Sequence, residues 1–264
     1  MRSYSVYQAD AFTDTLFGGN PAAICFFDEW PSDETMQKIA AENNLAETAF
    51  IVKEKEGYRI RWCTPTVEVK LCGHATLASA HIMFTELGYT DDAIQFNSLS
   101  GILKISRRKD GKMTLDFPAD PPQPVTDIPV GLLEGLGVTN AKVFKSSFDY
   151  LVILPSQKDI LALKPDFKVL MQVKTRGTVV SSVGDEVDFV SRCFFPQSGI
   201  DEDPVTGSAY TAMIPYWAEQ LGKTKMKAIQ LSARGGHLDC ELVDDRVLIS
   251  GNAVTYLKGE YYLP

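Results

Sequence analysis

The sequence has few side chains suited to binding a metal ion or cross-linking the chain. Its only histidines are His74, His81 and His237, and no H-E-x-x-H pair occurs. The five cysteines are scattered, odd in number and never spaced as C-x-x-C; they are Cys25, Cys63, Cys72, Cys193 and Cys240. This pattern argues against a disulfide framework and a zinc ribbon. We therefore expect no dedicated metal site, and we expect most of the cysteines to be small buried apolar residues.

Long apolar runs are also missing. No stretch approaches the roughly 18 apolar residues that a membrane span requires. The first residues, MRSYSVYQADAF, alternate like a strand and contain no apolar core of a signal peptide. The sequence therefore predicts a cytoplasmic protein.

Positive charge and nucleotide-binding loops are scarce as well. The net charge is -8, and such an acidic surface repels phosphate backbones and anionic lipid. The one basic run, 107–109, is followed by Asp110-Gly111 and reads as a hairpin tip. Gly18-Gly19-Asn20-Pro21 matches neither G-x-G-x-x-G nor G-x-x-x-x-G-K-[ST] and predicts a tight turn. We expect no nucleic-acid or membrane partner and no nucleotide, flavin or pyridoxal cofactor.

Many short strands surround a few helices in the predicted secondary structure. Ser32 is a plausible N-cap for a helix that ends near Asn43. Turn residues between alternating segments predict two hairpins. The first joins 102–106 to 113–117 through Lys109-Asp110-Gly111-Lys112, and the second joins 241–243 to 246–250 through Asp244-Asp245.

Two segments, Gly73–Gly88 and Gly207–Gly222, are the best helix candidates. Each begins at a glycine, is apolar nearly all round and ends in Leu-Gly, which predicts a buried helix with a glycine at its C-terminal end. An Arg-x-x-x-Pro unit precedes each, at Arg61 and at Arg192, which indicates an internal repeat. The proline-rich segment 118–124 is the expected break. We predict an α+β protein of two similar domains, each with strands wrapped around one central helix.

The residues at the starts of these helices could carry chemistry. His74 follows Gly73, and its imidazole could exchange a hydrogen bond with a substrate oxygen. Asp203 and Ser208 flank Gly207, although Asp and Ser also serve as ordinary helix caps. The unpaired N–H groups at Gly73 and Gly207 would attract a carboxylate or an enolate.

Glu47 is the candidate acid/base group. It lies in Leu-Ala-Glu-Thr-Ala-Phe, and small apolar neighbours would desolvate its carboxylate and raise the pKa towards neutrality. Such a group both takes and returns a proton near pH 7. The alternative is a solvent-facing glutamate at the start of a strand.

Five segments resemble the PhzF-like (phenazine biosynthesis) family. They are DAFTDTLFGGNPAAI, NLAETAFI, RWCTPTVEVKLCGHATLASAH, GIDEDPVTGSAYTAMIPYWAEQLGK and LSARGGHLDCEL, and they span nearly the whole chain. The combination of GHAT and EDPVTGSA is specific to that family. Ala46 departs from the pattern, because relatives often have serine there.

The resemblance implies a diaminopimelate-epimerase-like fold with an active-site cleft between two pseudo-symmetric halves. The expected domains are 1–117 with a returning segment 253–264, and 118–252. The family's acid/base glutamate falls on Glu47, and its other catalytic and binding positions fall on His74, Asp203, Gly73, Gly207 and Ser208. A homodimer is expected by the same resemblance.

These observations predict a cofactor-independent isomerase that moves a proton on a small anionic, carboxylate-bearing substrate. Two alternatives stay open: a catalytically silent member that binds a metabolite or a protein, and a racemase or epimerase. Cys72 occupies the place of the first catalytic thiol of two-thiol epimerases, but the second half has no matching cysteine, so we expect Cys72 to be structural.

Overall fold

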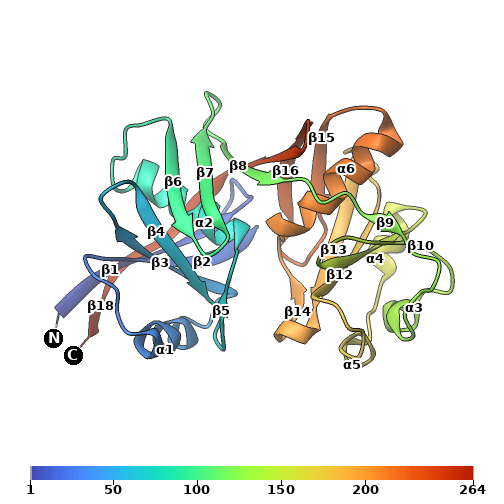
Figure 1. Cartoon of the computed structure of the whole chain (residues 1–264), viewed down its shortest axis with the longest axis horizontal. Coiled ribbons are helices and arrows are strands. Elements are labelled where there is room, and N and C mark those ends of the chain that lie inside the picture. The colour runs from blue at the N-terminus through green and yellow to red at the C-terminus, as the bar shows by residue number, and fades with distance from the viewer. Residues whose placement is uncertain (1, 264) are drawn as a thin grey trace. The chain divides into compact units, whose positions relative to one another are not determined.

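The computed structural model describes residues 2–263 and divides them into two compact units. Within the described residues, the first unit comprises 2–116 and 250–263, and the second comprises 117–249. Most of the strands and helices of both are labelled in Figure 1. None of the helices within residues 2–263 is long and apolar enough to cross a membrane.

The first unit is a mixed sheet with one helix on each face. Its strand order is β18-β1-β2-β3-β4-β6-β7-β8, with the short β5 beside β4. The elements are β1 (Arg2–Ala11), β2 (Asn20–Phe27), α1 (Asp33–Asn43), β3 (Glu47–Lys53), β4 (Tyr58–Cys63), β5 (Glu68–Val69), α2 (Gly73–Thr85), β6 (Ala93–Ser98), β7 (Gly101–Arg107), β8 (Met113–Pro118) and β18 (Ala253–Leu263). The first and last strands, β1 and β18, run side by side (Figure 1).

The second unit repeats this arrangement. Its strand order is β9-β10-β11-β12-β13-β15-β16-β17, with the short β14 beside β13. The elements are β9 (Gln123–Pro124), α3 (Leu132–Leu136), β10 (Lys142–Lys145), β11 (Asp149–Ile153), α4 (Gln157–Ala162), α5 (Phe167–Leu170), β12 (Gly177–Val183), β13 (Phe189–Phe195), the 3-10 turn η1 (Pro196–Ser198), β14 (Ile200–Asp203), the 3-10 turn η2 (Gly207–Ala209), α6 (Tyr210–Leu221), β15 (Lys225–Gln230), β16 (Gly236–Val243) and β17 (Arg246–Gly251).

The two sheets share the positions of their parallel pairs, which are β2–β3 and β4–β6 in the first unit and β11–β12 and β13–β15 in the second. Along the chain of each unit, the long apolar helix follows the short side strand: α2 lies between β5 and β6, and α6 lies between β14 and β15. The internal repeat that the sequence predicted is therefore present in the topology.

Helix α2 packs on β1, β2, β3 and β18, and all its residues except His81 and Thr85 are buried. Helix α1 covers the other face, where Met36 and Ala40 join an apolar cluster with Phe50. As predicted, α1 is capped by Ser32, whose hydroxyl accepts from the Thr35 N–H at 3.2 Å.

Helix α6 and the three short helices α3, α4 and α5 lie against opposite faces of β12 and β13. On the α6 face, Trp217 stacks on Phe189 with ring centroids 5.8 Å apart and donates to Ser181 at 2.9 Å. On the other face, Val180 and Phe194 join the cluster with α3, α4 and α5. Since side chains alternate across a strand, both faces of these strands can be buried at once.

The predicted hairpins and helix ends are confirmed. Strands β7 and β8 pair in an antiparallel hairpin, and β16 and β17 are neighbours joined through Asp244-Asp245. Gly222 ends α6 in the left-handed conformation, and Gly88, just past α2, has a φ of 66°. One prediction was wrong in detail: the α-helix of the second unit begins at Tyr210, since residues 207–209 form the tighter η2 turn.

Candidate active-site residues in the two units

Glu47 is the first residue of β3, directly after the crossover helix α1. Strand β3 pairs in parallel with β2, so that Glu47 lies opposite Ala22 near the start of β2. Its side chain is 13% exposed. The β2–α1–β3 crossover thus places a carboxylate, with little access to water, where β2, β3 and the start of α2 meet.

His74, the second residue of α2, lies between Glu47 and Asn20. Its Nε2 atom is 3.4 Å from Oε2 of Glu47, and its Nδ1 atom is 3.1 Å from the Asn20 amide nitrogen. The position of the single proton of the neutral ring depends on the tautomer: a bond donated by the Asn20 amide to Nδ1 places the proton on Nε2, on the side of Glu47.

Burial determines the charge of His74. Desolvation lowers the pKa of His74 to about 3, although a hydrogen bond with the backbone of Pro21 opposes the shift. The imidazole is therefore uncharged at neutral pH. The contact with Glu47 joins a carboxylate to a neutral ring, so His74 does not neutralise that carboxylate.

Asn20 is held in this position by the turn that precedes it. Gly19 has a φ of 59°, and a Cβ atom there would lie 2.0 Å from the carbonyl oxygen of Ala11. Only glycine fits such a close approach. The sequence indicated this tight turn but gave Asn20 no role. The feature that could have pointed to Asn20 is a polar residue between Gly-Gly and Pro at the start of an apolar strand.

Cys72 lies on the other side of the His74 ring. Its buried sulfur is 3.5 Å from Nδ1, whereas Glu47 approaches Nε2. One ligand atom from each of Glu47, Cys72 and His74 can be chosen within 4.8 Å of the others, a set that divalent metals accept. The expected absence of a metal stays a prediction.

Helix α2 begins at this cluster without a side-chain cap. Its N-cap residue is Cys72, which makes no capping hydrogen bond through its side chain. The Cys72 carbonyl instead accepts from the N–H and the hydroxyl of Thr76, at 3.2 and 2.5 Å. The first amides of the helix, at Gly73 and His74, therefore carry the positive end of the helix dipole.

In the second unit, Asp203 ends β14 and is 8% exposed. The Thr206 hydroxyl donates to its carboxylate at 2.5 Å. The fully buried Gln230 donates to the Asp203 carbonyl at 2.7 Å and accepts from the Thr206 N–H at 2.9 Å. These bonds fix the loop that carries Asp203, and the sequence gave no sign of the part played by Gln230.

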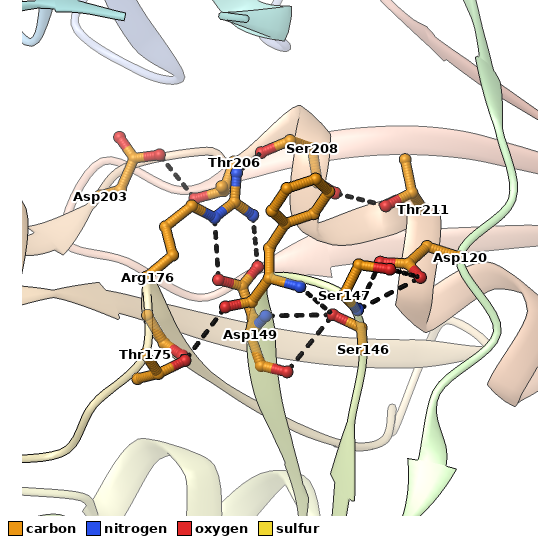
Figure 2. Close-up of polar contacts among 12 residues, drawn as sticks. Asp120, Ser146, Ser147, Asp149, Thr175, Arg176, Asp203, Thr206, Ser208 and Thr211 are labelled. Atoms are coloured by element: carbon orange, nitrogen blue, oxygen red, sulfur yellow. Dashed lines mark hydrogen bonds and ion pairs between the residues drawn. The ribbon is translucent and has the colours of Figure 1, made fainter. Parts of the chain in front are cut away.

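Ser208 lies in the η2 turn and accepts a hydrogen bond from Nη1 of Arg176 at 3.0 Å. Arg176 also donates to the carboxylate of the buried Asp149 through Nε, at 2.9 Å, and through Nη2. Figure 2 shows this fork. Burial opposes the charge of Arg176, but the bond and the charge of Asp149 outweigh it and hold the pKa of Arg176 above its usual value.

Each unit thus gathers its own predicted residues. Glu47, Gly73 and His74 meet in the first unit, and Asp203, Gly207 and Ser208 lie in one loop of the second. The catalytic and binding roles assigned to them, and the shared cleft, stay predictions. Sequence reasoning missed Asn20, Asp149 and Arg176, which no local motif marks.

The fold is that of diaminopimelate-epimerase-like proteins. The structure resembles a hydroxyproline epimerase from Agrobacterium vitis with a TM-score of 0.62, 8% identity, and coverage of 98% of this chain and 92% of the epimerase. This similarity concerns the fold alone.

Closer matches define the family. Residues 9–259 match the model of the "Phenazine biosynthesis-like protein" family. An "uncharacterized isomerase" from Pseudomonas aeruginosa is 48% identical over 98% of this chain and 99% of that protein. The crystal structure of a "phenazine biosynthesis protein PhzF family" member from Enterococcus faecalis has a TM-score of 0.95 and 41% identity, covering 99% of this chain and all of the other. The chain belongs to the phenazine biosynthesis-like (PhzF) family.

Proposed function

We propose that the protein is a cofactor-independent isomerase that moves a proton on a small carboxylate-bearing substrate, with Glu47 as acid and base. The observation that carries this proposal is the contact between Glu47 and the buried, uncharged His74 at the start of α2. Relatives named as isomerases and the epimerase-like fold support the same reaction class.

In this mechanism the Glu47 carboxylate removes a proton from a carbon next to a carbonyl or carboxyl group. In a substrate whose acidic carbon also neighbours a C=C bond, the electrons of the broken C–H bond move into that group and form a dienolate. Glu47, now protonated, returns the proton to the far carbon of the former C=C bond, so the double bond moves next to the carbonyl or carboxyl group. A base with little access to water beside an uncharged imidazole is suited to both steps.

His74 and the start of α2 stabilise the negative charge that develops. In the proposed tautomer the proton lies on Nε2, and this neutral N–H donates to an oxyanion that forms beside Glu47 without giving up its proton. The uncapped amides at Gly73 and His74 add the positive end of the helix dipole. Preorganised donors of this kind act on charge that exists only in the transition state.

Asp203 is the proposed second proton-transfer group. Thr206 and Gln230 hold its loop in one conformation, which supports a role that demands precise position. Asp203→Asn would lower turnover if the carboxylate carries a proton, and would weaken substrate binding if it holds a substrate amine.

A racemase with two catalytic thiols fits less well. The thiol nearest to the Asp203 loop is Cys193, whose strand pairs with Asp203. Burial raises the pKa of Cys193 well above its usual value, so it does not supply a thiolate at neutral pH. Burial raises the pKa of Cys240, the other cysteine of the second unit, in the same way, so neither is a reactive counterpart of Cys72.

The test is hydrogen exchange between solvent and substrate. Small carboxylates with an acidic C–H bond are incubated with the protein in deuterium oxide, and deuterium is located by proton NMR. Incorporation with migration of a double bond supports the proposal. Inversion of configuration would indicate an epimerase instead, and binding without exchange would indicate a silent member.

A further inference from the structure

Ser208 receives its hydrogen bond from a group that can only donate. The guanidinium of Arg176 has five N–H donors and no acceptor. Its Nε and Nη2 are occupied by Asp149, and its Nη1 donates to Ser208 Oγ at 3.0 Å (Figure 2). Within residues 2–263, Arg176 is the one side chain that hydrogen-bonds to this hydroxyl, so the hydroxyl hydrogen of Ser208 must point away from Arg176.

The position of Arg176 is itself fixed. Asp149 is buried, and its backbone N–H donates to Ser146 Oγ at 3.1 Å. The guanidinium also lies over the rings of Phe148 and Phe195, at 5.2 and 5.5 Å from their centroids. A planar group held at its edge and against its faces has one orientation, which makes Nη1 a rigid donor.

The first unit holds a polar residue at the start of its long helix in a related way. His74 and Ser208 are each the second residue of the segment that starts the long helix, and each contacts a nitrogen from the start of a parallel strand pair. The strands differ: Asn20 opens β2, the first strand of its pair, whereas Arg176 precedes β12, the second strand of its pair. Nη1 of Arg176 fills one of the two lone pairs of Ser208 Oγ, and the hydroxyl hydrogen is therefore directed to another acceptor.

We propose that Arg176, anchored by Asp149, is a positioning residue that fixes Ser208 as a hydrogen-bond donor to a carboxylate oxygen of the substrate. A carboxylate accepts such a bond, whereas an ammonium group has no lone pair with which to accept it and could only donate to the remaining lone pair of Ser208 Oγ, beside the positive guanidinium of Arg176. The inference rests on the proposed function and narrows the class of substrate. The substrate group that accepts the hydrogen bond from Ser208 is an anion, and a substrate amine would bind elsewhere.

The test uses butyrate as the probe, with butyramide and butylamine as isosteres of the same length. Each is titrated into the full-length, nitrogen-15-labelled protein, and the amide signals of Gly207 and Ser208 are followed. We expect butyrate to bind more tightly than either isostere. We expect Ser208→Ala to weaken butyrate binding about tenfold or more, because a hydrogen bond to a charged group is lost.

Arg176→Lys keeps the charge but cannot hold Asp149 and Ser208 at once, and it should weaken butyrate binding to a similar extent. The double variant Ser208→Ala/Arg176→Lys should bind no more weakly than Ser208→Ala alone, since both changes remove one interaction. Asp149→Asn loosens the anchor without changing its shape, and should give an intermediate loss. It serves as the second route if Arg176→Lys does not fold.

The matched control is Arg192→Lys. Arg192 makes the same kind of fork with Glu202, at 2.7 and 2.8 Å, and is bonded to the carbonyls of Ile160 and Leu163 rather than to a predicted site residue. It should leave butyrate binding unchanged. A thermal melt of each variant separates loss of binding from loss of fold.

Three results would overturn the inference: no saturable binding of butyrate, tighter binding of butylamine, or additive effects of Ser208→Ala and Arg176→Lys. Failure of the proposed function is a different result, because these titrations need no turnover. Butyrate binding through Ser208 without any hydrogen exchange in substrates would refute the isomerase and keep this inference.

Discussion

The Nε2 atom of His74 lies 3.4 Å from Oε2 of Glu47, and the imidazole that carries it is buried and uncharged at neutral pH. A charged imidazole here would neutralise the carboxylate. An uncharged one does not neutralise Glu47 and leaves its carboxylate able to act as a base. The chemistry proposed for this protein depends on that difference.

The first prediction concerns Glu47 itself. Glu47→Gln keeps the shape of the side chain but cannot accept a proton as a carboxylate does, so hydrogen exchange should fall by roughly 10²–10⁴-fold. Single-turnover exchange in deuterium oxide, alongside a thermal melt, is the measurement. The matched control is Glu42→Gln on the exposed part of α1, which should exchange at the wild-type rate. Wild-type exchange by Glu47→Gln with an unchanged melting temperature would make Glu47 a structural residue.

The second prediction is a pH dependence of stability caused by His74. Its pKa falls from 6.5 in the unfolded chain to about 3 in the folded protein, so between these values the unfolded state binds more protons. Stability should therefore be complete above pH 6.5 and decrease as the pH falls towards 3, by up to about 1.4 kcal/mol for each unit of pH.

Urea unfolding at pH 7 and pH 5 measures this effect, and His74→Gln should reduce the difference between the two. Burial also lowers the pKa of His81, against the opposing charge of Glu86, so His81→Gln is measured as well. An unchanged pH difference in His74→Gln would show that His74 is protonated in the folded protein.

The third prediction tests the turn that places Asn20. Gly19→Ala puts a Cβ atom 2.0 Å from a backbone oxygen at a positive φ, whereas Gly137, with a φ of 72°, has no atom within 4 Å of the same position. Gly137→Ala should cost about 1–2 kcal/mol, the ordinary cost of that backbone conformation. Gly19→Ala should cost at least about 2 kcal/mol more, because the backbone must move. Equal unfolding free energies of the two variants would mean that the turn adapts without strain.

The fourth prediction is that activity needs no metal. Elemental analysis of the purified protein should find no stoichiometric transition metal, and a chelator should leave hydrogen exchange unchanged. Cys72→Ser and the wild type should then behave alike in both measurements. One metal per chain, lost together with activity on chelation, would instead make Glu47, Cys72 and His74 a metal centre.

The sequence by itself determined the parts of the structure that depend on neighbours along the chain. The Ser32 cap, the turn at Lys109-Asp110-Gly111-Lys112 and the glycines that follow the long helices each act over a few residues, so their patterns can be read directly. The apolar composition of Gly73–Gly88 likewise predicted a buried helix. The start of the second helix was placed three residues early because a Gly-Ser-Ala segment is compatible with both the 3-10 turn and the α-helix.

Only the tertiary structure decided how the candidate residues are held. Asn20 is 54 residues from His74, and Arg176 is 27 residues from Asp149 and 32 from Ser208. Nothing local to an asparagine after two glycines, or to an arginine before a strand, specifies such partners. The parallel crossovers β2–α1–β3 and β11–α4–α5–β12 bring the strand starts together. Burial then sets the charge of His74, and Arg176 sets the direction of the Ser208 hydrogen bond. Desolvation and long-range hydrogen bonding depend on which segments pack together, and that is a property of the folded chain rather than of any stretch of its sequence.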